Sequence, residues 1–185
     1  AEQYMIEVLS RFKQDLEAAS GRAISDSDLS GAIRTCNRVR QGLADLYLLR
    51  SQQPGLISGK DLYAVVKGSM VMDRSLAADL LATLVETLSN QQSHNAWQGK
   101  RLVVSGSVCD TPMFHEWAAS SGAAVVADDL CTGQRWFEGV VTEQGHPIAA
   151  LADRYMHRIN CPAKHAGLTT RAAHLAQLVE KHQAD

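Results

Sequence analysis

The sequence predicts an α/β protein with a helical N-terminal half and an incomplete parallel, Rossmann-like α/β layer in its C-terminal half. Over residues 1–95, apolar residues recur at helical spacing between capping residues and Gly or Pro stops. After residue 99, two short apolar runs lie on either side of a helical stretch, and polar residues follow each run. That strand–helix–strand order is typical of parallel sheets. We therefore expect a helical region over residues 1–98 and a partial parallel α/β domain over residues 99–185.

Four helices are expected in the helical region, and their apolar stripes should form most of the core. The stripes are Tyr4, Val8, Leu9, Phe12 and Leu16; Leu29, Ile33, Cys36, Val39, Leu43, Leu46 and Tyr47; and Leu76, Leu80, Leu84 and Leu88. The boundaries follow from capping boxes and from Gly or Pro stops. In chain order, the boundary residues are Gly21, Ser25 with Asp28, Pro54-Gly55, Ser58 with Asp61, Val66 and Asp73. Cys36 lies on the second stripe and is expected to be a buried small hydrophobe.

The partial α/β domain should contain strands over residues 101–106 and 123–128, both covered on two faces because their apolar runs are continuous. Thr111 is expected to cap the helix between them, with Pro112 in its first turn. Two further helices are predicted, over residues 147–158 and 168–182. Two strands do not make a stable sheet, and a parallel fold needs another strand after the last helix. We therefore expect a segment of a longer protein, or a sheet that another chain completes.

Composition excludes several classes of protein. The 185 residues carry a net charge of −2 with scattered lysines and arginines, so no nucleic-acid partner is expected. No apolar run reaches the roughly 20 residues that span a bilayer, and no signal peptide is recognisable, so no membrane partner is expected. The four cysteines are widely spaced, which predicts no disulfide framework and a reducing, cytoplasmic location. The seven histidines show no HxH or HExxH pairing, so they predict no metal site.

The candidate functional site lies where the two predicted strands end. Ligands bind at the carboxyl ends of parallel strands, and polar residues follow both apolar runs here. These candidates for substrate contact or for the lining of a cleft are Ser105, Gly106, Asp128, Asp129, Cys131, Thr132, Gly133 and Arg135. No GxSxG motif accompanies the serines, which excludes an α/β-hydrolase nucleophile.

Three segments of the C-terminal half and one helical segment carry a family resemblance. They are SGSVCDTP (105–112), GAAVVADDLCTGQRWF (122–137), PIAALADRYMHRINCP (147–162) and the stretch from SGRAIS to YAVV (20–66). VADDLCTGQR is the most specific part, followed by ALADRYMHRINCP. Through these segments, nearly the whole chain resembles the middle region of the 2-hydroxyacyl-CoA dehydratase and benzoyl-CoA reductase family.

The resemblance implies an enzyme with several components. Family members pair two related subunits that hold [4Fe-4S] clusters through cysteines. An ATP-dependent activator protein supplies electrons for radical chemistry on an acyl-CoA substrate. The reaction is dehydration of (R)-2-hydroxyacyl-CoA or reduction of an aromatic acyl-CoA. The family's cluster cysteines fall outside this chain as we place them. We therefore expect the cofactor in the full-length parent, and neither a cofactor nor activity in this segment alone.

Several candidate residues have two interpretations. Cys131 is either a reactive thiolate or cluster contact favoured by the nearby arginine, or a small residue packed under a tight loop. Arg135 either holds a CoA phosphate or carboxylate with both arms of its guanidinium, or forms a salt bridge to Asp128 or Asp129. The spacing from Gly106 to Asp128 allows a non-catalytic α/β interaction or nucleotide-binding module, although SGSVCD lacks the GxGxxG pattern. At least one of the two aspartates is expected to hydrogen-bond the loop that follows them.

Overall fold

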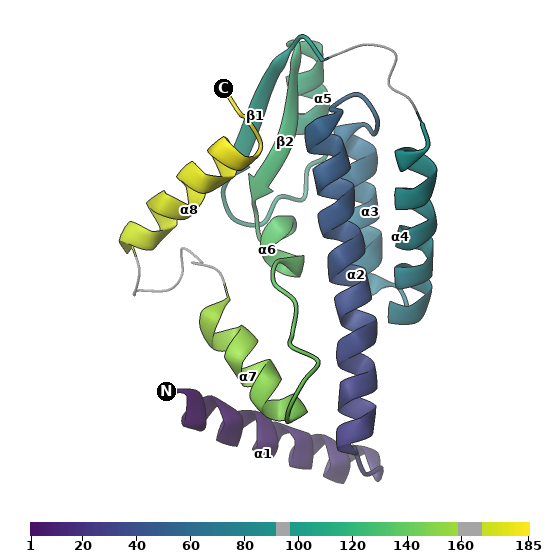
Figure 1. Cartoon of the computed structure of the whole chain (residues 1–185), viewed down its shortest axis with the longest axis vertical. Coiled ribbons are helices and arrows are strands. Elements are labelled where there is room, and N and C mark those ends of the chain that lie inside the picture. The colour runs from purple at the N-terminus through teal and green to yellow at the C-terminus, as the bar shows by residue number, and fades with distance from the viewer. Residues whose placement is uncertain (92–96, 159–167) are drawn as a thin grey trace.

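Helices surround a small two-stranded parallel sheet in the computed structural model, which describes residues 1–91, 97–158 and 168–185 (Figure 1). The predicted α/β class, with a helical N-terminal part, is confirmed. The elements are α1 (Glu2–Ser20), α2 (Asp26–Gln52), α3 (Gly59–Val71), α4 (Arg74–Ser89), β1 (Lys100–Ser105), α5 (Met113–Ser120), β2 (Ala123–Asp129), α6 (Gln134–Phe137), α7 (Pro147–His157) and α8 (Leu168–Lys181). None of the helices in the described part is both long enough and apolar enough to cross a lipid bilayer.

Three predicted capping residues, Ser25, Ser58 and Asp73, begin helices as expected. Ser25 Oγ accepts a hydrogen bond from the Asp28 backbone N–H (3.1 Å), and Asp28 Oδ2 accepts one from the Ser25 N–H (2.8 Å), which completes a capping box. Ser58 accepts from the Asp61 N–H at the start of α3, and Asp73 caps α4. Each cap satisfies backbone donors that have no partner within the first helical turn.

Two local predictions are wrong, and one short helix was not predicted. Helix α3 continues to Val71, beyond the predicted end at Val66, and it passes through Gly68 and Ser69, whose hydroxyl donates to the Val66 carbonyl within the helix (2.7 Å). Thr111 does not cap α5, since that helix begins one residue later, with Pro112 at the cap position and no side-chain capping bond. The short helix α6 was not predicted, because four residues are too few to show a period.

The main core is one cluster of buried side chains from α2, α3, α4 and α6, in which α2 packs directly on α4. In Figure 1, α2 runs along the long axis, with α3 and α4 on one side and the sheet on the other. Most of the predicted α2 stripe is buried: Ile33, Val39, Leu43, Leu46 and Tyr47. Cys36, which was expected to be buried, is only half-buried. The core therefore forms around one long helix that contacts both halves of the chain.

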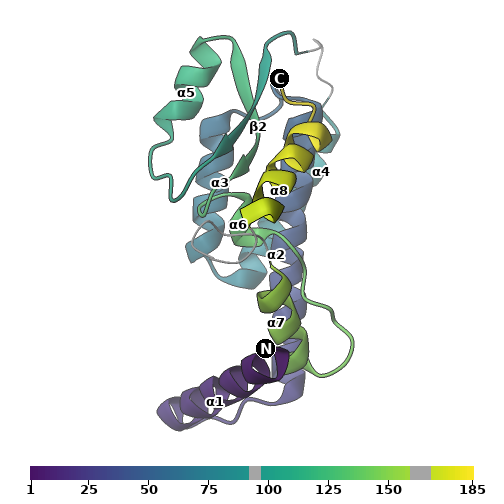
Figure 2. The ribbon, with the colours of Figure 1, turned by 90° about the vertical axis from the view of Figure 1, so that its left-hand side faces the viewer.

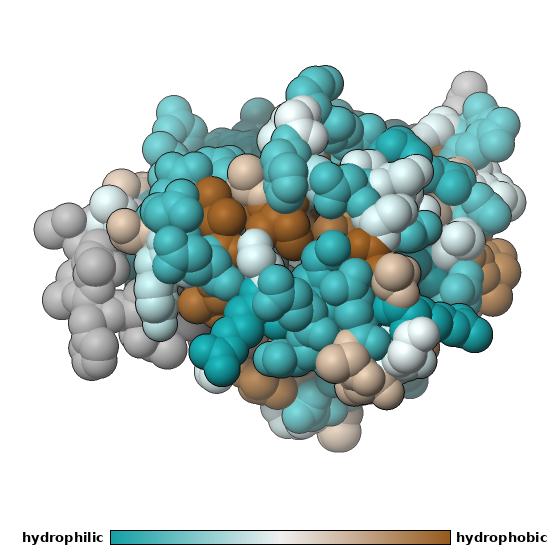
Figure 3. Space-filling view, turned by 90° about the horizontal axis from the view of Figure 1, so that it is seen from below, coloured by the Kyte–Doolittle hydropathy of each residue, from teal (hydrophilic) through white to brown (hydrophobic). Residues whose placement is uncertain are grey.

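The predicted α1 stripe is largely exposed, and the predicted α4 stripe is exposed in its first half, whereas Leu84 and Leu88 pack in the core. Tyr4 and Phe12 on α1 are 70% and 58% exposed, and Leu76 and Leu80 on α4 are about half exposed. Helix α1 projects at the lower end and packs mainly on α7 (Figure 2), while α4 turns Ala77 and its neighbours toward α2. Helical spacing gives the position of an apolar stripe, but the neighbours decide whether it is covered. Figure 3 shows apolar side chains among hydrophilic ones at this lower end.

Strands β1 and β2 are parallel neighbours, with Ser105 aligned to Asp129 at their carboxyl ends. All of β2 is buried, as predicted, whereas β1 is half-buried in its middle and exposed at both ends. In Figure 2 the sheet lies between α5 and α8. On the edge of β1 away from β2, the Arg101 carbonyl accepts a hydrogen bond from the Asp185 N–H (2.8 Å). Cover on both faces is thus achieved for β2 and not for β1.

Arg50 connects the two halves of the fold. Its side chain is buried, and its Nε donates to the Val125 carbonyl of β2 (2.9 Å). Its Nη1 donates to the carbonyls of Pro54 (3.1 Å) and Ile57 in the turn after α2. One guanidinium therefore satisfies three carbonyls from two segments that lie far apart in sequence.

Replacing Arg50 by Met should destabilise the fold strongly. The substitution keeps the length of the side chain but leaves buried carbonyls unpaired, each at a cost of about 1–3 kcal/mol. We expect the free energy of unfolding to fall by about 3 kcal/mol or more, measured by urea denaturation. Arg38→Met, at an exposed ion pair with Asp79 (2.6 Å), is the control and should cost at most about 1 kcal/mol. Equal losses in the two variants would contradict the linking role of Arg50.

Candidate functional site

The loops that follow the two strands are hydrogen-bonded to each other. The Gly106 N–H donates to the Asp129 carbonyl (3.2 Å), and the Cys131 N–H donates to the Ser107 carbonyl (3.0 Å). Parallel pairing with Ser105 aligned to Asp129 brings both loops to the same edge of the sheet. The structure therefore places the predicted site residues beside one another at this strand-exit edge.

Thr132 joins the same loops through its side chain. Its hydroxyl accepts a hydrogen bond from the Cys109 N–H and donates to the Cys109 carbonyl, both at 3.0 Å. A side chain that occupies both backbone groups of one residue holds the loop after β1 close to the loop after β2. Thr132 thus shapes the strand-exit edge.

Asp128 holds the loop after β2 and ties it to α2. Its Oδ1 accepts from the N–H groups of Leu130 (3.1 Å) and Gln134 (2.9 Å), and its Oδ2 accepts from the Tyr47 hydroxyl (2.5 Å). Gly133 lies so close that a Cβ there would collide with the Asp128 carboxylate. The prediction that one of the aspartates hydrogen-bonds this loop is confirmed.

Burial sets the protonation behaviour of this pair. Desolvation raises the pKa of Asp128, although its hydrogen bonds from Tyr47 and from the two backbone N–H groups oppose the shift. Burial, followed by the negative charge of Asp128, raises the pKa of Tyr47 well above its ordinary value. The phenol therefore remains a hydrogen-bond donor at neutral pH, and α2 stays tied to the end of β2.

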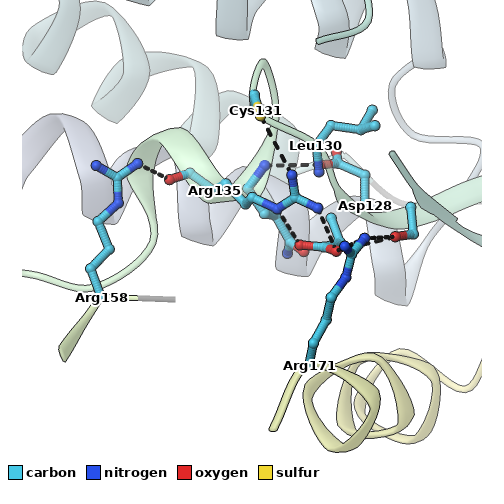
Figure 4. A network of polar contacts seen from close by, with 9 residues as sticks. Asp128, Leu130, Cys131, Arg135, Arg158 and Arg171 are labelled. Atoms are coloured by element: carbon cyan, nitrogen blue, oxygen red, sulfur yellow. Dashed lines mark hydrogen bonds and ion pairs between the residues drawn. The ribbon is translucent and has the colours of Figure 1, made fainter. Parts of the chain in front are cut away.

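Asp129 forms a buried bidentate ion pair with Arg135 (Figure 4). Arg135 Nε lies 2.5 Å from Asp129 Oδ1, Arg135 Nη2 lies 2.6 Å from Oδ2, and Ser105 donates to Oδ2 (3.1 Å). Burial acts to raise the pKa of Asp129, but the hydrogen bonds and charge of Arg135 outweigh it and leave the pKa below its ordinary value. Of the two interpretations of Arg135, the structure thus shows the salt bridge, and its partner is Asp129 rather than Asp128.

Arg135 also contacts the other ambiguous residue, Cys131. Its Nη1 donates to Cys131 Sγ (3.4 Å), and the cysteine is half-buried in the loop. Arg135 is only 3% exposed, and each of its three guanidinium nitrogens donates a hydrogen bond to a protein atom. As placed, Arg135 holds the loop in shape from behind, and it does not present its cation to solvent.

Two arginines that the sequence did not single out complete the network. Arg171 of α8 donates to Ser105 Oγ (3.2 Å) and lies 3.6 Å from Asp129 Oδ2, with 28% of its side chain exposed. Arg158, just after α7, donates to the Arg135 carbonyl. Figure 4 shows both reaching toward the loop, Arg171 from α8 and Arg158 from the coil that follows α7. Because these arginines lie at least 23 residues from their partners, no local sequence signal announced them.

The described residues do not form the ligand set of an iron–sulfur cluster. Cys36, Cys109 and Cys131 are free, and no three Cys, His, Asp or Glu side chains of the described ranges converge on one point. Cluster ligation needs several converging cysteines. Cys161, the fourth cysteine, lies outside the described residues. What the strand-exit edge does offer is a rigid, neutralised ion pair with Ser105 and Arg171 at its rim.

The whole chain matches one known protein family. Residues 1–185 match the family described as 2-hydroxyglutaryl-CoA dehydratase, D-component. The chain is similar to a benzoyl-CoA reductase subunit of Thauera aromatica, with 28% identity over 169 residues, and to the (R)-phenyllactyl-CoA dehydratase beta subunit of Clostridium sporogenes, with 23% over 172 residues. It is also similar to the beta subunit of (R)-2-hydroxyglutaryl-CoA dehydratase of Acidaminococcus fermentans, with 23% identity over 187 residues.

These similarities cover nearly all of this chain but only part of each relative. The three alignments span 88%, 93% and 99% of the chain, and 42%, 46% and 49% of the respective relatives. The chain therefore spans about half the length of the curated relatives it matches.

The two neighbouring aspartates should respond differently to loss of charge. Asp129→Asn leaves the buried Arg135 guanidinium without its partner, so we expect a loss of about 3–5 kcal/mol in unfolding free energy at pH 7. Asp128→Asn removes a charge that burial already disfavours and keeps an oxygen for the two backbone donors. We expect that substitution to cost about 1 kcal/mol or less at pH 7. Urea unfolding followed by circular dichroism measures both.

The pH dependence gives each aspartate its own control. Because the folded-state pKa of Asp129 is lowered, its stabilisation is present above its ordinary pKa of 3.8 and is lost as the pH falls through the folded value. Wild type and Asp129→Asn should therefore converge in stability toward pH 3. The pKa of Asp128 is raised, so its contribution is complete below 3.8 and is lost as the pH rises through the folded value. The loss of unfolding free energy in Asp128→Asn, relative to wild type, should thus be smaller at pH 7 than at pH 3. A larger loss at pH 7 would contradict the raised pKa of Asp128.

Proposed function

Since the chain belongs to the 2-hydroxyglutaryl-CoA dehydratase, D-component, family over residues 1–185, we propose that it is part of a subunit of an enzyme acting on an acyl-CoA thioester. The reaction we propose is radical dehydration of an (R)-2-hydroxyacyl-CoA, or reduction of an aromatic acyl-CoA. The match over the whole chain carries this proposal. Relatives named as a benzoyl-CoA reductase subunit and as two dehydratase subunits support it.

The proposal includes components beyond this chain. The relatives are each named as one subunit of an enzyme, two of them as beta subunits, which supports a related second subunit as partner. We further propose that the full-length protein holds a [4Fe-4S] cluster, that an ATP-dependent activator reduces it, and that the enzyme works in the cytoplasm. When bound, the cluster would supply single electrons. The described residues of this chain do not fit as its ligands, so their proposed role is structural support and substrate contact.

We propose that the strand-exit edge borders the active-site cleft of the full-length enzyme. Ligands of parallel sheets bind beyond the carboxyl ends of the strands, which is where this edge lies. Arg135 acts there as a positioning residue, since it holds Asp129 and Cys131 while remaining buried. Ser105 and the partly exposed Arg171 are the proposed points of contact with substrate.

The alternative of a non-catalytic, nucleotide-binding module has less support. In dinucleotide folds an acidic residue at the position of Asp128 accepts hydrogen bonds from a ribose. Here Asp128 is buried, and both of its oxygens already accept from Tyr47 and from backbone N–H groups. A ribose would have to displace these bonds.

Composition and activity of the full-length protein test the proposal. Purified without oxygen, it should be brown and contain iron and acid-labile sulfide in equal amounts, and with its second subunit and activator it should convert a 2-hydroxyacyl-CoA or an aromatic acyl-CoA. The 185-residue chain alone should be colourless. Iron-free full-length protein without acyl-CoA turnover would contradict the proposed function. Stoichiometric iron and sulfide in this chain alone would instead contradict our placement of the cluster ligands.

Arg171→Gln tests the strand-exit edge as a substrate contact. Loss of a hydrogen bond to a charged group costs roughly 1.5–3 kcal/mol, so we expect the KM for the acyl-CoA to rise about tenfold or more, with a smaller change in kcat. The matched control is Arg34→Gln, at an exposed arginine on α2, which should leave both constants unchanged. Unaltered kinetics in a correctly folded Arg171→Gln enzyme would place this edge away from the substrate.

A further inference from the structure

A pocket of about 200 Å³ lies between α2, α6 and the end of α7, apart from the strand-exit edge. Four arginines and three aromatic rings are among its lining residues: Arg40, Arg74, Arg154, Arg158, Trp136, Phe137 and Tyr155. The arginines come from α2, from the first turn of α4, and from successive turns of α7 and its end. Elements that lie far apart in the sequence therefore bring several positive charges to one cavity.

Arg154 is the most buried of these arginines, with 7% of its surface exposed. Its Nε donates to the Gly139 carbonyl (2.7 Å) and its Nη2 to the Glu138 carbonyl (2.9 Å). These bonds hold the side chain in place, but carbonyls carry no negative charge to neutralise it. Burial, and then the positive charges of Arg40 and Arg158, lower the pKa of Arg154 to about 10.

Arg40 and Arg74 are held by neutral groups as well. Arg40 Nη1 donates to Asn37 Oδ1 (2.9 Å), and Arg74 donates to the carbonyls of Ser69 and Met70. The Arg74 guanidinium also lies over the Trp136 ring, 5.5 Å from its centre. Each of these arginines therefore has a defined orientation without a carboxylate as its partner.

No ion pair neutralises Arg40, Arg74 or Arg154 within the residues that the structure describes. The carboxylate of Glu138 acts electrostatically on Arg158, but Glu138 lines a neighbouring cavity rather than this one. Buried charges are costly unless an opposite charge compensates them. Arg40, Arg74 and Arg154 therefore bring oriented guanidinium groups without an ion-pair partner among the described residues to this pocket, which favours the binding of an anion.

We propose that this arginine pocket binds the diphosphate group of a phosphorylated small molecule. Guanidinium groups match phosphate oxygens with two parallel hydrogen bonds, and a diphosphate brings enough negative charge for several arginines at once. At about 30 Å³ for each water-sized group, the pocket holds roughly six or seven such groups, which suits a diphosphate and is too small to hold a whole nucleotide by itself. The diphosphate is inferred from the pocket alone, whereas coenzyme A as its source rests on the proposed function.

A second, larger cavity borders the arginine pocket and offers space for the remainder of a larger ligand. A cavity of about 390 Å³ between α2, α6 and α8 shares Arg40 and Phe137 with the arginine pocket. A free diphosphate would fill the arginine pocket alone, whereas a diphosphate within a cofactor such as coenzyme A would extend into this second cavity. The arginines would bind the diphosphate in the same way in both ligands, and competition experiments distinguish the two.

Calorimetric titration of the full-length protein with inorganic pyrophosphate and with coenzyme A tests the proposal. We expect saturable binding of pyrophosphate and a change in the fluorescence of Trp136, which Trp136→Phe should abolish without abolishing the heat of binding. Competition between the two ligands would assign the pocket to the diphosphate of the cofactor. Binding of pyrophosphate without competition would assign it to a free anion. Absence of pyrophosphate binding would overturn the proposal.

Matched arginine variants locate the binding. Arg40→Gln and Arg74→Gln remove half-buried arginines whose contacts are to neutral groups, so circular dichroism should report an unchanged fold. Each should weaken pyrophosphate binding about tenfold or more, the loss expected for a hydrogen bond to a charged group. Arg38→Gln, on the same helix but exposed and paired with Asp79, should change the affinity less than about twofold. An equal loss in Arg38→Gln and Arg40→Gln would show binding to surface charge in general and would overturn the assignment.

Discussion

The two aspartates that end β2 hold the elements of this fold together. Asp128 accepts from Tyr47 of α2 and from the backbone of the following loop, and Asp129 accepts both arms of Arg135. The side chains of Asp129 and Arg135 are almost completely buried, which is favourable only when the geometry is good and the remaining oxygens have donors. Ser105 meets that condition from β1, and Arg171 does so from α8. A sheet of two strands, α2 and α8 are thus joined through adjacent carboxylates.

Buried arginines serve this fold in two different ways. Arg50 and Arg154 are bound through backbone carbonyls, and Arg135 is bound through a carboxylate. A carbonyl accepts hydrogen bonds from a guanidinium but does not neutralise its positive charge. A carboxylate does both. The charge of Arg135 is therefore balanced by Asp129 at the strand-exit edge, whereas Arg40, Arg74 and Arg154 have no ion-pair partner among the described residues of the arginine pocket. Two sites made from the same residue type consequently have different chemistry: one holds a buried ion pair, and the other is proposed to bind an anion.

The family match covers the whole chain, and the structure shows which elements this chain contains. It matches its family from end to end while spanning less than half of each relative described above. Its sheet has two strands, of which β1 is only half-buried, and its described residues bring no three metal-binding side chains together. What it does supply is a helical core around α2 and one ordered edge of a parallel sheet. Supporting a site and shaping its rim are roles that such an architecture can fill.

Features that depend on neighbouring residues could be predicted from the sequence, whereas cover, pairing and charge followed from the packing of distant elements. The Ser25–Asp28 capping box and the loop held by Asp128 rest on bonds within a few residues. The apolar stripe of α1 has the spacing of a core helix, yet it is exposed because no described element packs over its outer side. Arg135 pairs with Asp129, and Arg171 reaches the same carboxylate from α8. Contacts of that range depend on how helices pack rather than on local spacing, and the energy of a buried charge depends on those contacts.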